Sequence, residues 1–403
     1  MTSRLSWLDT DPDQNRRMNE LVDLFKDKSA VDELGIGTIR DTFANALFPG
    51  TSVLHTRARY LLFIAWLLDD VARHGWTPDR AQQELRSREV KLIKALLAGG
   101  EGGGRGVIGE QAKDKLKRMP SAAYWAALRR FGLRLHDTSI AGHFRAAAQE
   151  GRRHHEREDD EPGRSSLGVD PQIPPPPRDF LSVASFALTE DEARYLRDKI
   201  ASRCPGSLFA DLVLADPLTD DDLANVSFIW EHPHFETFDA RHQRLIDHGQ
   251  RLHHLQYGAA LLYNLILAEK TKSDDLVETY EADIERWLDT ARSEVCLDGW
   301  DFDDFWLCVA ENATSVIRSP TRSFVTAWHR ILSTGDVTGK AARTLVANRE
   351  LQLKGPRSRI HNPSARLQWT GGAGLVALSY RWEVAQRYLL DLANAREVAD
   401  AVA

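Results

Sequence analysis

The residue pattern Pro78-Asp79, followed by Glu89-x-Lys91, has the side chains that a metal-dependent nuclease uses. In such a site two carboxylates hold Mg²⁺ and a lysine positions the attacking water. That chemistry usually places the acid and the lysine on a strand. Here Arg80 to Leu97 has the apolar spacing of a helix, with its charges predicted on the solvent face. A nuclease using Asp79, Glu89 and Lys91 is therefore an alternative and not the preferred interpretation.

A histidine-rich segment, Glu231 to Glu236, offers a second kind of chemistry. Its His232 and His234 are of the type that ligates zinc. Their spacing matches neither HExxH nor a standard zinc finger. Exposed histidine pairs on loops are common in proteins that bind no metal. The sequence therefore predicts no cofactor, and His232 and His234 stay the alternative metal ligands.

Two further patterns resemble catalytic motifs but do not match them, and two common nucleophile signatures are absent. The run TGDVTGKA is one residue short of a phosphate-binding loop, and Ala341 stands where Ser or Thr would bind Mg²⁺. His136-Asp137 lacks identifiable companion ligands for a metal phosphohydrolase. No GxSxG and no Cys/His nucleophile signature is present. A non-enzymatic role is thus favoured over an enzymatic one.

The charges are segregated along the chain. The net charge is −7, yet Arg105 to Arg153 carries +7 and Val337 to Arg366 carries +6, which leaves −20 for the remainder. A chain that is acidic overall is not a general polyanion binder. Local basic segments can nevertheless form a nucleic-acid-binding face.

The C-terminal basic segment has the more specific pattern. Between Pro356 and Pro363 it carries arginines, a histidine and an asparagine that suit phosphate oxygens. Aromatic residues follow at Trp369, Tyr380 and Trp382 and could stack on bases. The competing interpretation is a solvated basic loop that pairs with the acidic regions 211–239 or 294–304 of the same chain. The predicted nucleic-acid-binding residues are Arg40, Arg57, Arg59, Lys354, Arg357, Arg359, His361, Asn362, Arg366, Trp369 and Arg381.

Arg57 and Arg59 lie at the start of a predicted helix, where anions are favoured. They could form an anion pocket with Arg40. Alternatively they are buried and pair with Asp32, Glu33 and Asp41 to fix the fold, which is the interpretation that we favour.

Apolar periodicity predicts a mainly α, multi-helix fold with little or no sheet. Two helical parts, 1–150 and 179–403, are expected on either side of a charged and proline-rich linker at 151–178. Any strand is short and lies around 375–381. The predicted helices are 16–25, 38–47, 55–74, 78–97, 124–135, 190–201, 238–270, 276–291, 302–312, 321–332, 340–351 and 383–395.

The chain has the features of a cytoplasmic protein. Its three cysteines are far apart, which fits no disulfide framework. The N-terminus lacks a basic region followed by an apolar core, so no secretory signal is expected. The longest apolar stretch, Tyr60 to Leu68, is too short to cross a bilayer.

Four segments carry a family resemblance: SWLD at 6–9, DELGIGTIRDTFANALFPGTSVLHTRARYLLFIAW at 32–66, RSRIHNPSARLQWTGGAG at 357–374, and LSYRW at 378–382. With them the chain resembles an uncharacterised bacterial family of unknown function. The resemblance implies a setting near helicases and nuclease-like proteins in antiviral-defence gene neighbourhoods. It implies no activity and transfers no catalytic residue.

Taken together, the basic segments and the resemblance predict a non-enzymatic accessory component of a bacterial defence or DNA-processing system. Its expected partners are nucleic acid, with DNA preferred, and a helicase or nuclease protein. The alternatives are a metal-dependent nuclease or phosphohydrolase and a protein-protein scaffold.

Overall fold

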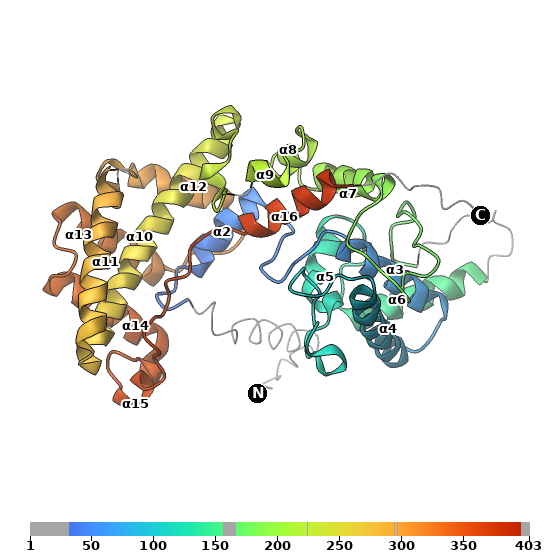
Figure 1. The fold of residues 1–403 in the computed structure, drawn as a ribbon, viewed down its shortest axis with the longest axis horizontal. Helices are drawn as coiled ribbons and strands as arrows, with labels where there is room; N and C mark the ends of the chain where they lie inside the picture. The colour runs from blue at the N-terminus through green and yellow to red at the C-terminus, as the bar shows by residue number, and fades with distance from the viewer. Residues whose placement is uncertain (1–31, 156–166, 224, 294, 296, 396–403) are drawn as a thin grey trace, which may run out of the picture. The chain divides into compact units, whose positions relative to one another are not determined.

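The structure is a computed structural model that describes residues 32–155, 167–223, 225–293, 295 and 297–395. It is built from helices, which confirms the predicted fold class (Figure 1). The described residues contain no strand, and the isolated bridge between Arg134 and Val169 is the one β-type pairing among them. Residues 375–381, where a short strand was expected, form irregular chain. The helix predicted at 16–25 lies outside the described residues.

The chain divides into two compact units, each made of segments that are distant in sequence. Unit 1 contains the residues up to Phe43 together with Gln243–Leu378, and unit 2 contains Ala44–His242 together with the residues from Ser379 onward. One boundary lies inside α2 (Gly37–Leu47) and another near the start of α10 (Ala240–Thr271).

This division differs from the predicted one, because both sides of the segment 151–178 belong to unit 2. Residues 151–155 end α6 (Ile140–His155), and the described residues from 167 onward pack within unit 2. Asp170 lies 2.5 Å from the Lys199 ammonium, and the indole of Trp66 donates to the Pro174 carbonyl at 2.7 Å. These contacts hold the proline-rich end of the segment in place.

Unit 2 is organised around α3 (Tyr60–Arg73), in which all but three residues are buried. This matches the expectation that a helix that is apolar nearly all round lies in a core. It contacts α4, α5 and α6. α7 (Glu190–Arg203) begins with a capping box between Thr189 and Glu192. The other helices of unit 2 are α4 (Pro78–Ala98), α5 (Pro120–Arg130), α6 (Ile140–His155), α7 (Glu190–Arg203), α8 (Leu208–Leu214), α9 (Asp220–Leu223) and α16 (Trp382–Ala393).

Unit 1 is built on the long helix α10, beside which α11 runs (Figure 1). Gly258 allows the two helices to approach closely, because a Cβ atom there would lie 2.0 Å from the Trp287 ring. The same indole donates to the His254 carbonyl at 2.9 Å. The other helices of this unit are α11 (Asp274–Ser293), α12 (Phe302–Asn312), α13 (Ser319–Thr334), α14 (Lys340–Lys354) and α15 (Pro363–Arg366).

Within the described ranges, no helix has the length and hydropathy that a membrane span requires.

We predict that Gly258→Ala destabilises unit 1. The added methyl group must displace the packed Trp287 ring, and overpacking of this kind typically costs about 1–3 kcal/mol. Thermal unfolding should show a lower Tm for the variant. Gly299→Ala is the matched control, because a Cβ atom at Gly299 meets nothing within 4 Å. Equal melting temperatures for the two variants would contradict the close approach.

Candidate nucleic-acid interface

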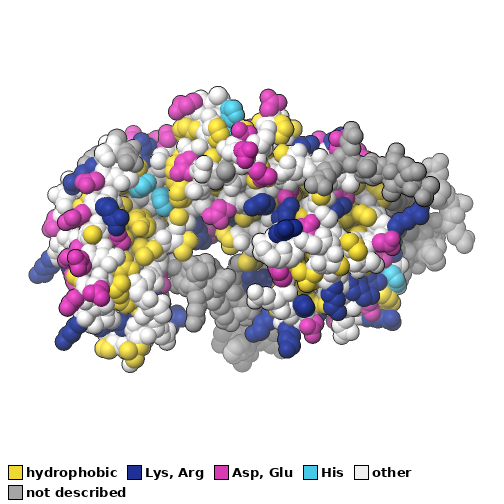
Figure 2. Space-filling view, in the orientation of Figure 1, with side chains coloured by type: hydrophobic (Ala, Val, Ile, Leu, Met, Phe, Trp, Pro, Cys, Tyr) yellow, Lys and Arg dark blue, Asp and Glu magenta, His cyan; other side chains and the backbone are white. Residues whose placement is uncertain are grey.

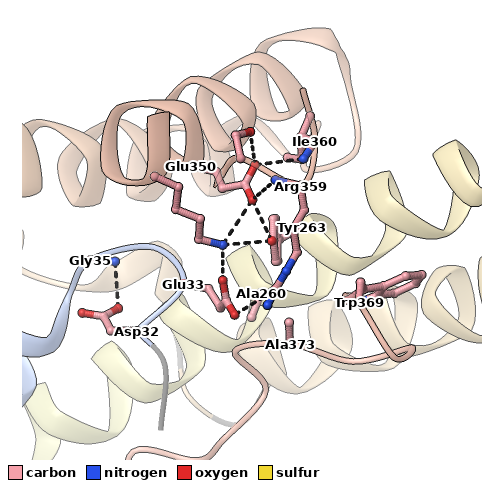
Figure 3. Close-up of polar contacts among 12 residues, drawn as sticks. Asp32, Glu33, Gly35, Ala260, Tyr263, Glu350, Arg359, Ile360, Trp369 and Ala373 are labelled. Atoms are coloured by element: carbon pink, nitrogen blue, oxygen red, sulfur yellow. Dashed lines mark hydrogen bonds and ion pairs between the residues drawn. The ribbon is translucent and has the colours of Figure 1, made fainter. Parts of the chain in front are cut away.

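The C-terminal basic loop of unit 1 surrounds a buried carboxylate, Glu350 (Figure 3). Glu350 accepts hydrogen bonds from Tyr263 Oη at 2.9 Å and Ser358 Oγ at 2.6 Å. It also accepts from the backbone N–H groups of Arg359 at 2.8 Å and Ile360 at 3.0 Å. Burial by itself raises the pKa of Glu350, but these donors outweigh burial and hold the pKa below its usual value. The loop is therefore folded around a negative charge.

A second buried carboxylate, Glu33, neutralises the cations of this loop. Arg359 Nη1 lies 2.8 Å from Glu33, and the Lys354 ammonium contacts both Glu33 and Glu350. Figure 3 shows the Arg359 side chain reaching Glu33. The loop thus pairs with carboxylates of the same chain, as one of the two interpretations expected, but with different ones. Among the described residues its ion-pair partners are Glu33 and Glu350, which lie outside the acidic regions 211–239 and 294–304 that this interpretation named.

The other predicted residues of the loop also make internal contacts. Arg366 donates to the carbonyls of Arg359 at 2.9 Å and Ile360 at 2.8 Å. His361 contacts Ser358, and Asn362 caps α15. Arg357 differs, because it is exposed and has no polar partner among the described residues.

The aromatic residues that were predicted to stack on bases are also engaged inside the protein, by a hydrogen bond or by burial. Trp369 Nε1 donates to Asn264 Oδ1 at 3.0 Å, while Tyr380 and Trp382 are 2% and 0% exposed. A base could therefore not reach the ring faces of Tyr380 and Trp382 without unfolding the chain around them.

In unit 2 the segment Thr56 to Tyr60 forms ion pairs with helices that are distant in sequence. Arg57 Nη2 lies 2.7 Å from Asp391 on α16, and Arg59 Nη2 lies 2.8 Å from Glu192 on α7. Burial raises the pKa of Asp391 although Arg57 opposes that shift. The interpretation of structural arginines fits this geometry, but the partners are not the predicted Asp32, Glu33 and Asp41.

Two further predicted arginines also have local partners. Arg40 pairs with Asp41 at 3.1 Å, which is a pair that the structural interpretation expected, although both side chains are partly exposed. Arg381 donates to Asn45 Oδ1 at 2.7 Å and to the Thr51 carbonyl at 3.0 Å. The basic residues of the resemblance motifs thus act mainly as internal counterions and donors.

The structure places Asp79, Glu89 and Lys91 on one helix, α4, as the spacing predicts. Asp79 and Glu89 are ten residues apart, which corresponds to about 15 Å along a helix axis. The expectation that all charges of this helix face solvent is wrong at Glu89, which is 1% exposed. It accepts from the Ser121 backbone N–H at 2.6 Å. Burial raises its pKa from the ordinary 4.5 to about 7.

His232 and His234 lie beside each other, and the backbone N–H of His234 donates to His232 Nδ1 at 3.1 Å. Over the described part of the chain, no group of three or more His, Cys, Asp or Glu side chains is arranged to hold a metal ion.

Uncompensated positive charge gathers instead on unit 2, on α4 and on the segment that packs against it. This segment, residues 109–118, includes the short 3₁₀ helix η1 (Lys113–Lys115) and is held by Arg86, which donates to the Asp114 and Leu116 carbonyls. We define the basic face as five exposed lysines that form no ion pair with any described carboxylate: Lys91, Lys94, Lys113, Lys115 and Lys117. Figure 2 shows dark-blue side chains gathered over this region.

The +7 charge of residues 105–153 was the sequence signal for Lys113, Lys115 and Lys117 of the basic face, whereas Lys91 and Lys94 lie outside that segment. Asp114 is the exposed acid among its lysines, while the Glu110 carboxylate accepts from the Gly103 backbone N–H at 2.7 Å. The face therefore keeps a net positive charge.

We predict that the two arginines of the C-terminal loop differ in their effect on stability. Arg359→Ala removes one of the two cations that pair with buried Glu33 and should lower the free energy of unfolding by about 1–3 kcal/mol. Arg357→Ala removes an exposed side chain and should change it by less than about 0.5 kcal/mol. Urea unfolding of both variants measures this difference. Equal stabilities would show that Arg359 has no structural role.

We also predict that Glu89→Gln removes part of the pH dependence of stability. The folded pKa of about 7 exceeds the unfolded value, so the stability that Glu89 contributes is present below pH 4.5 and is lost as the pH rises through 7. The amide of the variant can still accept from the Ser121 N–H but does not ionise. Between pH 5 and pH 8 the wild type should lose on the order of 2–3 kcal/mol more than the variant. Urea unfolding at both pH values tests this, and parallel pH profiles would contradict it.

Comparison with known proteins gives a family and no activity. The family model described as "Family of unknown function (DUF6361)" matches residues 2–396. No curated protein and no solved structure was found to match the chain. Because the family model spans nearly the whole sequence, the chain belongs to the DUF6361 family.

Proposed function

We propose that this protein associates with nucleic acid through the basic face of unit 2, as a non-enzymatic accessory component of a bacterial defence or DNA-processing system. The observation that carries the proposal is the set of five exposed lysines without a described counterion. Neutralising phosphate with such cations releases condensed counterions, which drives association with polyanions.

The chemistry of the basic face favours contacts with the nucleic-acid backbone. Lysine is a flexible point charge that contacts phosphate, whereas arginine is the usual bidentate reader of guanine. Apart from the exposed Arg357, the arginines and aromatic rings that were predicted to contact nucleic acid, such as Arg359 and Trp382, make contacts inside the fold. The proposed binding is therefore independent of sequence, and a helicase or nuclease partner would supply the reaction. DNA is the preferred nucleic acid.

The test is binding of labelled duplex and single-stranded DNA and RNA over a salt series. The triple variant Lys113→Glu, Lys115→Glu, Lys117→Glu should bind duplex DNA at least about tenfold more weakly than the wild type. The slope of log affinity against log salt should flatten by up to about 0.9 for each lysine that contacts a duplex phosphate.

The matched control changes three exposed lysines of unit 1, Lys270, Lys272 and Lys340, to glutamate, which alters the net charge equally. It should retain wild-type affinity. The proposal fails if the wild type does not bind at low salt, or if the two triple variants lose affinity equally. Cleavage that requires added Mg²⁺ or Mn²⁺ and persists through purification would favour the nuclease alternative.

A further inference from the structure

Unit 1 has an open groove where α12 ends and α13 begins. Two adjoining depressions make up this groove, of about 490 Å³ and about 450 Å³, and Ile317 and Arg322 line both of them. The first depression has a largely apolar wall, which includes the side chain of Val316. The second runs along α13 as far as Arg330. Among the described residues that line the two depressions, none is Asp or Glu.

The groove is positively charged. Arg322 and Arg330, which line it, and Arg318 beside it are exposed, and none of them forms an ion pair with a described carboxylate. The segment 312–335, which includes all of α13, contains no acid. α13 begins at the groove with Ser319, and the positive end of its dipole adds to the charge of the arginines. The groove therefore favours an anionic partner.

The groups that would contact this partner are accessible. Val316 is 87% exposed at the apolar depression. The Arg322 guanidinium lies over the Trp306 ring, 4.8 Å from its centroid, and donates no hydrogen bond to any described residue. Because stacking already orients this guanidinium, it loses less freedom when a carboxylate binds to it.

The spacing of the two arginines sets the spacing of the acids that the partner needs. Arg322 and Arg330 are eight residues apart on α13, which corresponds to about 12 Å along the helix axis. An extended peptide covers this distance in about four residues. Side chains four residues apart in an extended chain also point to the same side. Two acids at positions i and i+4 of such a peptide can therefore reach both arginines.

The apolar depression favours a protein segment over nucleic acid. An apolar side chain of the partner gains free energy when it leaves water and lies against Val316 and Ile317. The sugar-phosphate backbone of a nucleic acid carries no such group. Base stacking is also disfavoured, because Trp306 is 7% exposed and Arg322 lies over its ring.

We propose that this groove binds an extended acidic segment of a partner protein. Carboxylates of the segment pair with Arg322 and Arg330, and an apolar side chain next to them lies against Val316. The groove belongs to unit 1 and the basic face to unit 2. The protein contact thus goes beyond the proposed nucleic-acid contact and does not depend on it.

The test uses the full-length protein and a fluorescein-labelled peptide of twelve residues, with two central leucines and five glutamates on each side. Fluorescence anisotropy should show saturable binding that weakens as salt is added. The double variant Arg322→Glu, Arg330→Glu should bind at least about fivefold more weakly, because attraction becomes repulsion. The control Lys270→Glu, Lys272→Glu changes two exposed lysines of unit 1 and the net charge equally. It should bind as the wild type does.

A second pair of variants tests the apolar depression without changing any charge. Val316→Ser should weaken binding of the leucine peptide about threefold. Val53→Ser is the same substitution at a valine of unit 2 that is 70% exposed, and it should have no effect. A peptide with serines in place of the leucines should bind the wild type more weakly and should not distinguish Val316→Ser from the wild type.

Three outcomes would overturn the proposal. The first is absence of saturable binding by the leucine peptide. The second is an equal loss of affinity in the arginine and the lysine double variants. The third is binding of duplex DNA that Arg322→Glu, Arg330→Glu weakens as much as it weakens peptide binding, because the groove would then be a nucleic-acid site.

Discussion

The charge of Glu350 constrains the architecture of unit 1, because an ionised carboxylate without exposed surface is tolerated only when donors surround it. Those donors come from α10, from α14 and from the loop that follows α14. Lys354 and Arg359 extend the network to Glu33, which lies 321 and 326 residues away. Unit 2 has the same kind of interaction, because Asp391 forms an ion pair with Arg57 and Glu192 forms one with Arg59. Buried ion pairs thus join the distant segments from which each unit is made.

This constraint separates two populations of basic residues that look alike in the sequence. Arg359 and Arg57 are bound to carboxylates inside the protein, so their charge is already compensated. Lys113 and Lys117 are exposed and have no such partner among the described residues, so their charge is available to an external polyanion. The local density of basic residues is therefore a poor guide to a binding surface unless the acids that approach them in the fold are known.

The sequence predicts the helices better than it predicts their contacts. α10, α12 and α14 begin within two residues of the expected positions, because apolar spacing and breakers are local signals. α6 was missed because its polar, histidine- and arginine-rich end resembles a linker. The pairing of Arg57 with Asp391, 334 residues away, has no local signal. Glu89 did have one, since it falls between Leu85 and Leu92 on the apolar stripe of its helix, but its charge suggested an exposed position.

The interleaving of the two units has a consequence for biosynthesis. Unit 2 starts at Ala44 but includes α16, and the network of unit 1 joins Glu33 to Arg359. A ribosome must therefore synthesise most of the chain before Arg57 can pair with Asp391 or Glu33 with Arg359, whereas Arg59 can meet Glu192 earlier. Neither unit can therefore be completed from one continuous stretch of chain as it leaves the ribosome, which is how domains usually fold during translation. Until α16 emerges, Arg57 lacks Asp391, and unit 2 stays incomplete.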